Sequence, residues 1–160
     1  MESAFLLLGT NLGDRLLHLT KCREKLTSMG KLTAISGIYE TAPWGLSHQP
    51  EFWNQAIRLE TSLEPLDLLK DLKRIELESG RRETVRWGPR EIDIDILFFG
   101  TLQLNLPEFT IPHPRLQERK FALVPLMEIA PQHRDPLSGK TVEEMYRDCT
   151  DELQVRAIYL

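Results

Sequence analysis

Hydrophobic and polar positions follow two different periods along the first half of the chain, and each period predicts a type of element. Residues 4–8 are a continuous apolar run, which is typical of a buried strand. From Arg15 to Met29 an apolar residue recurs every three or four positions, which predicts a helix capped by Gly30. Residues 32–39 and 52–60 are rich in β-forming side chains, and we expect these two segments to be strands that pair.

The second half of the chain repeats this order and then becomes less regular. Pro65 begins a second amphipathic pattern, which predicts a helix that stops at Gly80. Residues 92–99 are the clearest strand, and we expect residues 102–104 to return beside it as a small hairpin arm. Further on, the pattern predicts short helices near 123–129 and 142–146 and a last strand at 155–159.

The predicted element order is βαββαβ, followed by C-terminal additions. This order matches the split βαβ or ferredoxin-like α+β fold, in which two helices cover one face of a mostly antiparallel sheet. No internal repeat and no Ser/Gly-rich or charged linker divides the chain, so residues 1–160 are expected to form a single domain.

Composition narrows the possible partners. The formal net charge of -4 argues against a protein that binds nucleic acid mainly by neutralising phosphates. The chain contains no basic secretory leader and no apolar stretch near the roughly 20 residues that span a bilayer, so we expect no membrane association. Cys22 and Cys149 show no metal-binding spacing and are expected to be reduced thiols of a cytoplasmic protein.

The strongest chemical signal is a pair of carboxylates in the predicted strand 92–99. Side chains of a strand alternate between its faces, so Asp93 and Asp95 project to one side, about 7 Å apart, opposite Ile94. Paired carboxylates repel unless a cation lies between them, and oxygen ligands favour a hard ion such as magnesium. The alternative is a half-exposed strand whose acids are simply solvated, which is the more frequent situation for an isolated Asp-x-Asp.

Arginines just before this strand favour the metal interpretation. Gly88 and Pro89 mark residues 80–90 as a loop, and planar guanidinium groups bind phosphate oxygens in pairs. The loop contains Arg81, Arg82, Arg86 and Arg90. An acidic strand beside an arginine-rich loop therefore suggests a site that holds magnesium and a polyphosphate.

Two further clusters carry weaker signals. His113 stands between two prolines and is followed by Arg119, although a loop histidine is more often a surface residue than a functional one. Trp44, Phe52 and Asn54 place aromatic rings near an amide, which suits a flat heterocycle; alternatively, Phe52 or its neighbour Trp53 packs in the core. The Gly- and Asn-rich residues 9–14 lack the lysine of a phosphate loop and are interpreted as a turn.

Seven motifs, in this order, resemble those of the 6-hydroxymethyl-7,8-dihydropterin pyrophosphokinases, a family of folate-pathway enzymes. The motifs are LLLGTNLGDR (6–15), YETAPWG (39–45), QPEFWN (49–54), RIELESGR (74–81), RWGPREIDIDIL (86–97), IPHPRLQERKF (111–121) and PLMEIAP (125–131). The resemblance covers residues 4 to 131, and RWGPREIDIDIL is its most specific part. It implies an enzyme in which the hydroxymethyl oxygen of the pterin attacks the β-phosphorus of ATP, so that pyrophosphate is transferred and AMP is released.

The resemblance also implies roles on the nucleotide side. Asp93 and Asp95 would hold two magnesium ions that bridge the triphosphate, and Arg81 and Arg90 would close on the phosphates as catalytic residues. The same loop contains Arg82 and Arg86, which would bind ATP, and Trp87, which would contact the pterin. Ile96, Thr110, His113 and Arg119 would contact the nucleotide.

On the pterin side, the resemblance assigns Asn54 to the polar edge of the ring. Phe52 and Phe121 would lie against its faces, and Thr41, Ala42 and Trp44 would surround its rim. No general base is implied, because positioning and charge neutralisation carry most of a phosphoryl-type transfer. The expected enzyme is a monomer that acts on small molecules alone.

Two other functions remain as alternatives at this point. One is a different Asp-x-Asp glycosyl or nucleotidyl transferase, in which the paired acids hold a metal on a nucleotide sugar or triphosphate. The other is a non-enzymatic ferredoxin-like module that binds RNA on its sheet. The second would need exposed aromatic residues and a basic surface, which the acidic balance of the chain disfavours.

Overall fold

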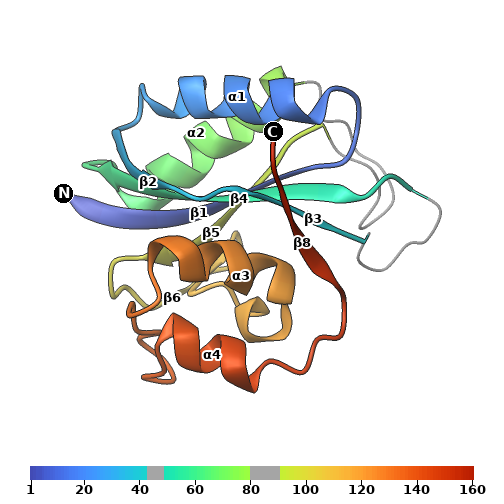
Figure 1. Ribbon diagram of the computed structural model, residues 1–160. Helices are drawn as coiled ribbons and strands as arrows, with labels where there is room; N and C mark the ends of the chain where they lie inside the picture. The colour runs from blue at the N-terminus through green and yellow to red at the C-terminus, as the bar shows by residue number, and fades with distance from the viewer. Residues whose placement is uncertain (43–48, 80–90) are drawn as a thin grey trace.

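The computed structural model of the 160-residue chain describes residues 1–42, 49–79 and 91–160. Six strands form the main sheet (Figure 1). They are β1 (Glu2–Thr10), β2 (Lys31–Ile35), β3 (Ile38–Thr41), β4 (Phe52–Thr61), β5 (Asp93–Phe99) and β8 (Val155–Ile158). The strand order is β5-β1-β4-β3-β8, with β2 also paired to β4, and every pair is antiparallel.

Helices cover both faces of this sheet (Figure 1). On one face lie α1 (Arg15–Leu26) and α2 (Pro65–Glu78), and on the other lie α3 (Lys120–Ile129) and α4 (Val142–Asp148). The remaining elements are the short strands β6 (Leu104–Asn105) and β7 (Thr110–Ile111) and the 3-10 turn Leu116–Glu118. With β2 and β3 taken as one interrupted strand, the order is βαββαβ, so the predicted ferredoxin-like arrangement with C-terminal additions is confirmed.

Alternation along β1 separates the two hydrophobic cores. Leu6 and Leu8 pack in the core beneath α1 and α2, whereas Phe5 and Leu7 pack in the core beneath α3 and α4. The continuous apolar run at the N-terminus therefore indicates a strand buried on both faces, as the sequence predicts. Among the described residues, none of the helices has the length and apolar character needed to cross a membrane.

The predicted end of the first helix is wrong. The helix stops at Leu26 with Thr27 as its C-cap, three residues before the predicted end. Gly30 does not cap it; a Cβ atom at this position would lie 2.1 Å from the backbone oxygen of Glu60. Glycine is required there because the chain passes against the backbone of β4 at Glu60, which is a tertiary contact that local helical spacing does not reveal.

Two strand predictions also need correction. Residues 32–39 form two strands instead of one, with a break at Ser36, whose backbone N–H donates to Ala56 O and whose hydroxyl accepts from the Ala56 N–H, both at 2.9 Å. The expected arm at 102–104 does not return beside β5. The chain turns at Gly100, where φ is 55°, and Leu104–Asn105 pairs with Thr110–Ile111 instead.

Candidate active site

Asp93 and Asp95 are the first and third residues of β5, and their side chains point to the α3 side of the sheet. Both are half-buried and line one cavity, whereas Ile94 and Ile96 are buried in the opposite core, beneath α1 and α2. The predicted division of this strand into an acidic face and an apolar face is therefore confirmed. In the described residues, no third histidine, cysteine or carboxylate joins them in a metal-binding cluster.

The wall opposite the aspartates comes from the segments that the sequence assigns to a flat heterocycle. The same cavity is lined by Leu7, Gly9, Thr41, Ala42, Phe52, Asn54, Arg119 and Phe121. Thr41 pairs with Phe52 across β3 and β4, and the Asn54 side-chain amide donates to the Thr41 hydroxyl at 3.1 Å. The cavity thus combines carboxylates, two aromatic rings and a buried amide.

Phe52 and Trp53 divide between the cavity and the core, as alternation requires. Phe52 lines the cavity, whereas Trp53 packs against the core on the other side of the sheet and donates its indole N–H to Glu40 at 2.9 Å. Of the two neighbouring rings, only Phe52 is therefore available to a ligand.

Gly9 is a cavity residue that the sequence analysis missed. It pairs with Asp93 on one side and with Asn54 on the other, so it lies between the acidic strand and the amide in one row of the sheet. A Cβ atom here would meet the Asn54 amide oxygen at 3.3 Å. The turn interpretation of residues 9–14 holds for its later part, since Gly13 has φ of 70° and Asp14 caps α1 by accepting from Leu17 N–H at 3.0 Å.

A groove runs along the outer edge of β5, which is the edge strand of the sheet, between α2 and the β6–β7 arm. Both aspartates also border it, together with Ile96, Thr110 and His113, three of the residues predicted to contact the nucleotide. The groove contains Lys73 and Glu76 of α2 as well, which the sequence analysis did not single out. Helical spacing marks Lys73 only as an exposed position.

His113 is fixed by its backbone and by one ring nitrogen. Its backbone N–H donates to Leu97 O at 3.0 Å, and its ring Nδ1 accepts from the backbone N–H of Arg115 at 3.2 Å. Burial, followed by the charge of Arg119, lowers the pKa of His113 to about 4, although Asp93 acts in the opposite direction. The imidazole is therefore neutral at pH 7 and offers hydrogen bonds instead of positive charge.

Arg119 lies in the cavity wall with the aspartates, away from the groove that holds Thr110 and His113. Its guanidinium carbon is 5.6 Å from the centre of the Phe121 ring. Burial lowers the pKa of Arg119, and the negative charges of Asp95 and Asp93 oppose this effect. The arginine remains charged, so it supplies a fixed positive group beside the two carboxylates.

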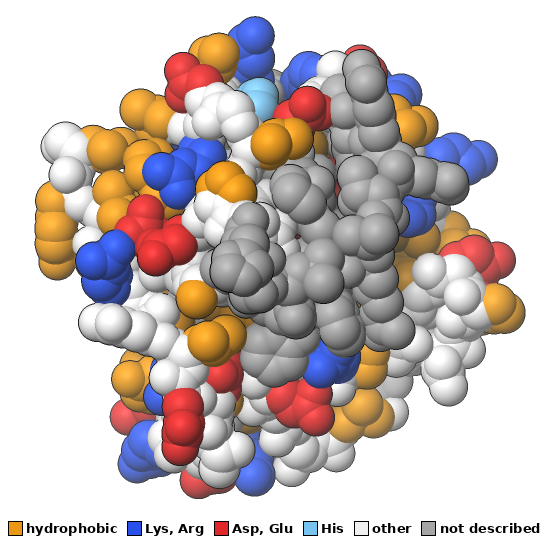
Figure 2. All heavy atoms as spheres, turned by 90° about the vertical axis from the view of Figure 1, so that its right-hand side faces the viewer, with side chains coloured by type: hydrophobic (Ala, Val, Ile, Leu, Met, Phe, Trp, Pro, Cys, Tyr) orange, Lys and Arg blue, Asp and Glu red, His pale blue; other side chains and the backbone are white. Residues whose placement is uncertain are grey.

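The other predicted site residues lie outside the described part of the chain. They are Trp44, Arg81, Arg82, Arg86, Trp87 and Arg90. Figure 2 shows one face of the molecule, where the described lysine and arginine side chains are interspersed with aspartates and glutamates. On the described part of this face, the basic residues do not form one continuous surface of the kind that nucleic-acid binding requires.

Comparison with known proteins identifies similar chains. Residues 5–131 match the family model described as 7,8-dihydro-6-hydroxymethylpterin-pyrophosphokinase (HPPK). A protein of Aquifex aeolicus named 2-amino-4-hydroxy-6-hydroxymethyldihydropteridine pyrophosphokinase is 40% identical over 144 residues, which cover 90% of each chain. A Bacillus subtilis protein of the same name is 41% identical over 147 residues, covering 90% of this chain and 88% of the relative.

The fold also matches solved structures. A crystal structure of Plasmodium falciparum HPPK-DHPS with pteroate superimposes with a TM-score of 0.74 at 18% identity. The match covers 92% of this chain but only 42% of the other, so this chain spans less than half the length of that protein. At this identity, the likeness supports the fold alone.

Proposed function

This chain belongs to the 7,8-dihydro-6-hydroxymethylpterin-pyrophosphokinase family. We propose that the chain carries out the reaction of this family in the cavity around Asp93 and Asp95. The family reaction transfers pyrophosphate from ATP to the hydroxymethyl group of 6-hydroxymethyl-7,8-dihydropterin, in folate biosynthesis. One observation carries the assignment of the site: both aspartates and the aromatic and amide groups around Asn54 line the same cavity. A donor phosphate and a flat acceptor would meet there.

Asp93 and Asp95 would hold the magnesium ions. Two half-buried carboxylates on one face of a strand fit a hard divalent cation, because such ions prefer carboxylate oxygens as ligands. Magnesium bound there would neutralise charge on the triphosphate as the bond between its α and β groups breaks. These two carboxylates would fill part of the coordination shell and leave room for phosphate oxygens and water.

The pterin would occupy the wall formed by Thr41, Ala42, Phe52, Asn54 and Phe121. The Asn54 amide nitrogen is already bound to the Thr41 hydroxyl, which fixes the amide and leaves its oxygen as an acceptor for the polar edge of the ring. Phe52 and Phe121 would pack against the ring faces. For Trp44 and Trp87 the proposed contacts with the pterin rest on the sequence resemblance.

ATP would extend from the aspartates into the groove beside β5. Ile96, Thr110 and His113 would contact its base and ribose, and Arg119 would approach the phosphates from the cavity. Arg82 and Arg86 would add contacts to ATP, and Arg81 and Arg90 would be the catalytic arginines of the closed site; these four roles rest on the resemblance. The groove and the cavity share both aspartates, which is the arrangement that a transfer between two substrates needs.

The proposed chemical step is a direct displacement. The hydroxymethyl oxygen forms a bond to the β-phosphorus, the bond from that phosphorus to the oxygen bridging the α group breaks, and AMP leaves. The hydroxyl proton passes to solvent. The residues would contribute by holding the oxygen and the phosphorus in line and by balancing charge, without a dedicated general base.

Phosphorus NMR of the complete reaction tests this function. Protein, magnesium-ATP and 6-hydroxymethyl-7,8-dihydropterin should yield AMP and the pterin pyrophosphate with no ADP, and nothing should form when the pterin is omitted. ADP as the product, or no turnover, would count against the proposal and in favour of another Asp-x-Asp transferase. Turnover should also stop when a chelator removes magnesium.

Three broader features belong to the same proposal. We expect residues 1–160 to fold as one domain, to act as a monomer and to work in the cytoplasm with small molecules as the only partners. Light scattering of the purified protein at micromolar concentration would test the monomeric state.

A further inference from the structure

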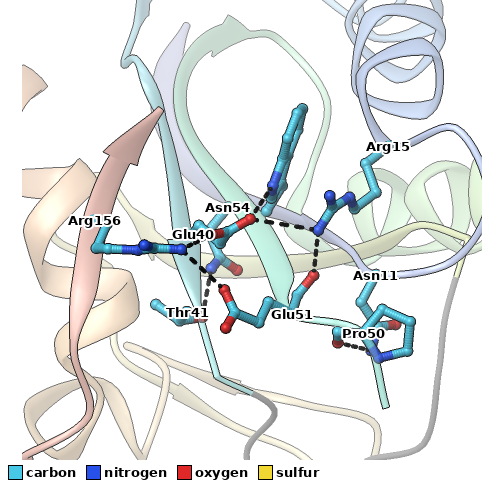
Figure 3. Close-up of polar contacts among 9 residues, drawn as sticks. Asn11, Arg15, Glu40, Thr41, Pro50, Glu51, Asn54 and Arg156 are labelled. Carbon is cyan, nitrogen blue, oxygen red and sulfur yellow. Dashed lines mark hydrogen bonds and ion pairs between the residues drawn. The ribbon is translucent and has the colours of Figure 1, made fainter. Parts of the chain in front are cut away.

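Four charged side chains meet behind the strands that form the pterin wall (Figure 3). They are Arg15 at the start of α1, Glu40 of β3, Glu51 just before β4 and Arg156 of β8. We call them the rear ion cluster. It joins residues from the two ends of the chain, and the proposed mechanism uses none of them.

Arg156 contacts both carboxylates of the rear ion cluster. Its Nη2 donates to Glu40 Oε1 and lies 3.4 Å from Glu51 Oε2 (Figure 3). Arg15 approaches from the other side: its Nη1 donates to the Glu51 backbone oxygen at 2.8 Å and lies 3.6 Å from Glu40 Oε2. The guanidinium of Arg15 also stacks 4.4 Å from the centre of the Trp53 ring. Both arginines thus bridge β3 and the start of β4.

The two glutamates lie near each other, because both contact the same nitrogen of Arg156. The Trp53 indole N–H, as the largest influence, lowers the pKa of Glu40. The neighbouring carboxylate of Glu40 raises the pKa of Glu51. Two carboxylates in this relation repel when both are ionised, and the charges of Arg156 and Arg15 offset the repulsion.

The rear ion cluster lies directly behind the pterin wall. Glu40 pairs with Trp53 and with Arg156 across the sheet, and Trp53 packs on the α1 side. The neighbouring residues Thr41 and Asn54 therefore face the opposite side and line the cavity. Any change in the spacing between β3 and β4 at Glu40 would therefore move the Thr41 hydroxyl and the Asn54 amide, which are hydrogen-bonded to each other on the cavity side.

Asn11 fixes the same region from the end of β1. It is almost fully buried, and its side-chain amide donates to the Pro50 backbone oxygen at 2.9 Å (Figure 3). The same amide donates to Gln49 Oε1 at 3.0 Å. The residues before β4 are therefore held by β1 through Asn11, by α1 through Arg15 and by β8 through Arg156. Of these three attachments, only Arg156 belongs to the C-terminal region.

We propose that Arg156 is a positioning residue for the pterin: by holding Glu40 and Glu51 together, it keeps Thr41 and Asn54 in the arrangement that receives the ring. This inference rests on the proposed function of the cavity. Arg156 does not line the cavity and acts only through the strands that it joins. The last strand therefore contributes to substrate selection, beyond its part in packing.

Substrate titrations of Arg156→Ala test this inference. Pterin fluorescence should report a dissociation constant about three- to tenfold higher than in the wild type, while ATP affinity stays within about twofold, as expected for a partly exposed charge network. Arg156→Lys should recover part of the loss. Arg134→Ala is the matched control, because Arg134 also pairs with a glutamate, Glu144 of α4 at 3.9 Å, but contacts neither β3 nor β4; it should bind both ligands normally.

A double variant separates positioning from general stability. Replacing Glu51 by Gln in the Arg156→Ala protein removes the repulsion that the missing arginine leaves, so pterin affinity should recover to within about twofold of the wild type. Unchanged pterin binding in Arg156→Ala, an equal loss for ATP and pterin, or no recovery in the double variant would each overturn the inference. Failure of the wild type itself to bind pterin would instead overturn the proposed function, and this inference with it.

Discussion

The buried carboxylate of Glu76 accepts a hydrogen bond from the backbone N–H of Ile94 at 2.8 Å. Ile94 stands between the two aspartates on the edge strand, where its outward N–H meets α2 instead of another strand. Glu76 therefore fixes β5 from its open side, and it does so at the position between the proposed metal ligands.

Replacing Glu76 should disturb the acidic strand. Glu76→Ala leaves the Ile94 N–H without this acceptor, so we expect about 1–3 kcal/mol lower stability and a kcat reduced by about tenfold or more. Glu76→Gln retains an acceptor oxygen and should lie much closer to the wild type in both respects. Urea unfolding and steady-state kinetics would measure the two effects; normal turnover in Glu76→Ala would show that β5 does not need this contact.

Replacing either aspartate should abolish turnover while preserving the fold. For Asp93→Asn or Asp95→Asn we expect kcat to fall by about 10³-fold or more, since metal stabilisation of transition-state charge is worth several kcal/mol. Tm should change little, because both side chains are half-buried and neither belongs to the two hydrophobic cores. Asp148→Asn, which changes a carboxylate of α4 paired with Lys140, is the control and should remain fully active. Near-normal rates in both site variants would contradict the assignment.

Gly9→Ala tests the row that joins Asp93, Gly9 and Asn54. The added Cβ would lie 3.3 Å from the Asn54 amide oxygen, so the amide must shift. We expect the KM for the pterin to rise about tenfold, equivalent to about 1.4 kcal/mol, with little change in ATP affinity. Kinetics with each substrate varied in turn would measure this; equal effects on both substrates would indicate a general distortion of β1.

His113 should titrate far below an ordinary histidine. Its pKa is lowered from 6.5 to about 4, chiefly by burial, so the native ring should remain neutral above pH 5. The unfolded chain then binds a proton that the native site does not, and the free energy of unfolding should fall as the pH decreases from about 6.5 to 4. Imidazole NMR shifts, assigned with His113→Asn, would measure the midpoint; a value near 6.5 would disprove the assigned environment.

Strand periodicity predicts the fold well because the period of two decides which side chains are buried together. It places the aspartates opposite Ile94 and Ile96, and it separates Phe52 from Trp53, as the structure confirms. The errors have tertiary causes. Gly30 is explained by its close approach to Glu60, and the break in the strand at Ser36 by its bonds to Ala56; local sequence encodes neither contact.

The candidate site is predictable only where chemistry is concentrated in a motif. The motifs point to Asp93, Asp95 and Asn54, and the structure brings all three to one cavity. Gly9 was missed because its contribution is the absence of a side chain, and Glu76 because its partner is a backbone N–H of another element. Arg156 lies in the C-terminal region, which carries no family motif.

A crystal structure of the protein with magnesium, the pterin and an ATP analogue that resists cleavage between its α and β groups would test the proposed site most directly. We expect magnesium at about 2.1 Å from carboxylate oxygens of both Asp93 and Asp95, in contact with the phosphates, and the pterin ring beside Asn54. Carboxylates of Asp93 and Asp95 that contact no cation, with the triphosphate bound elsewhere, would contradict it.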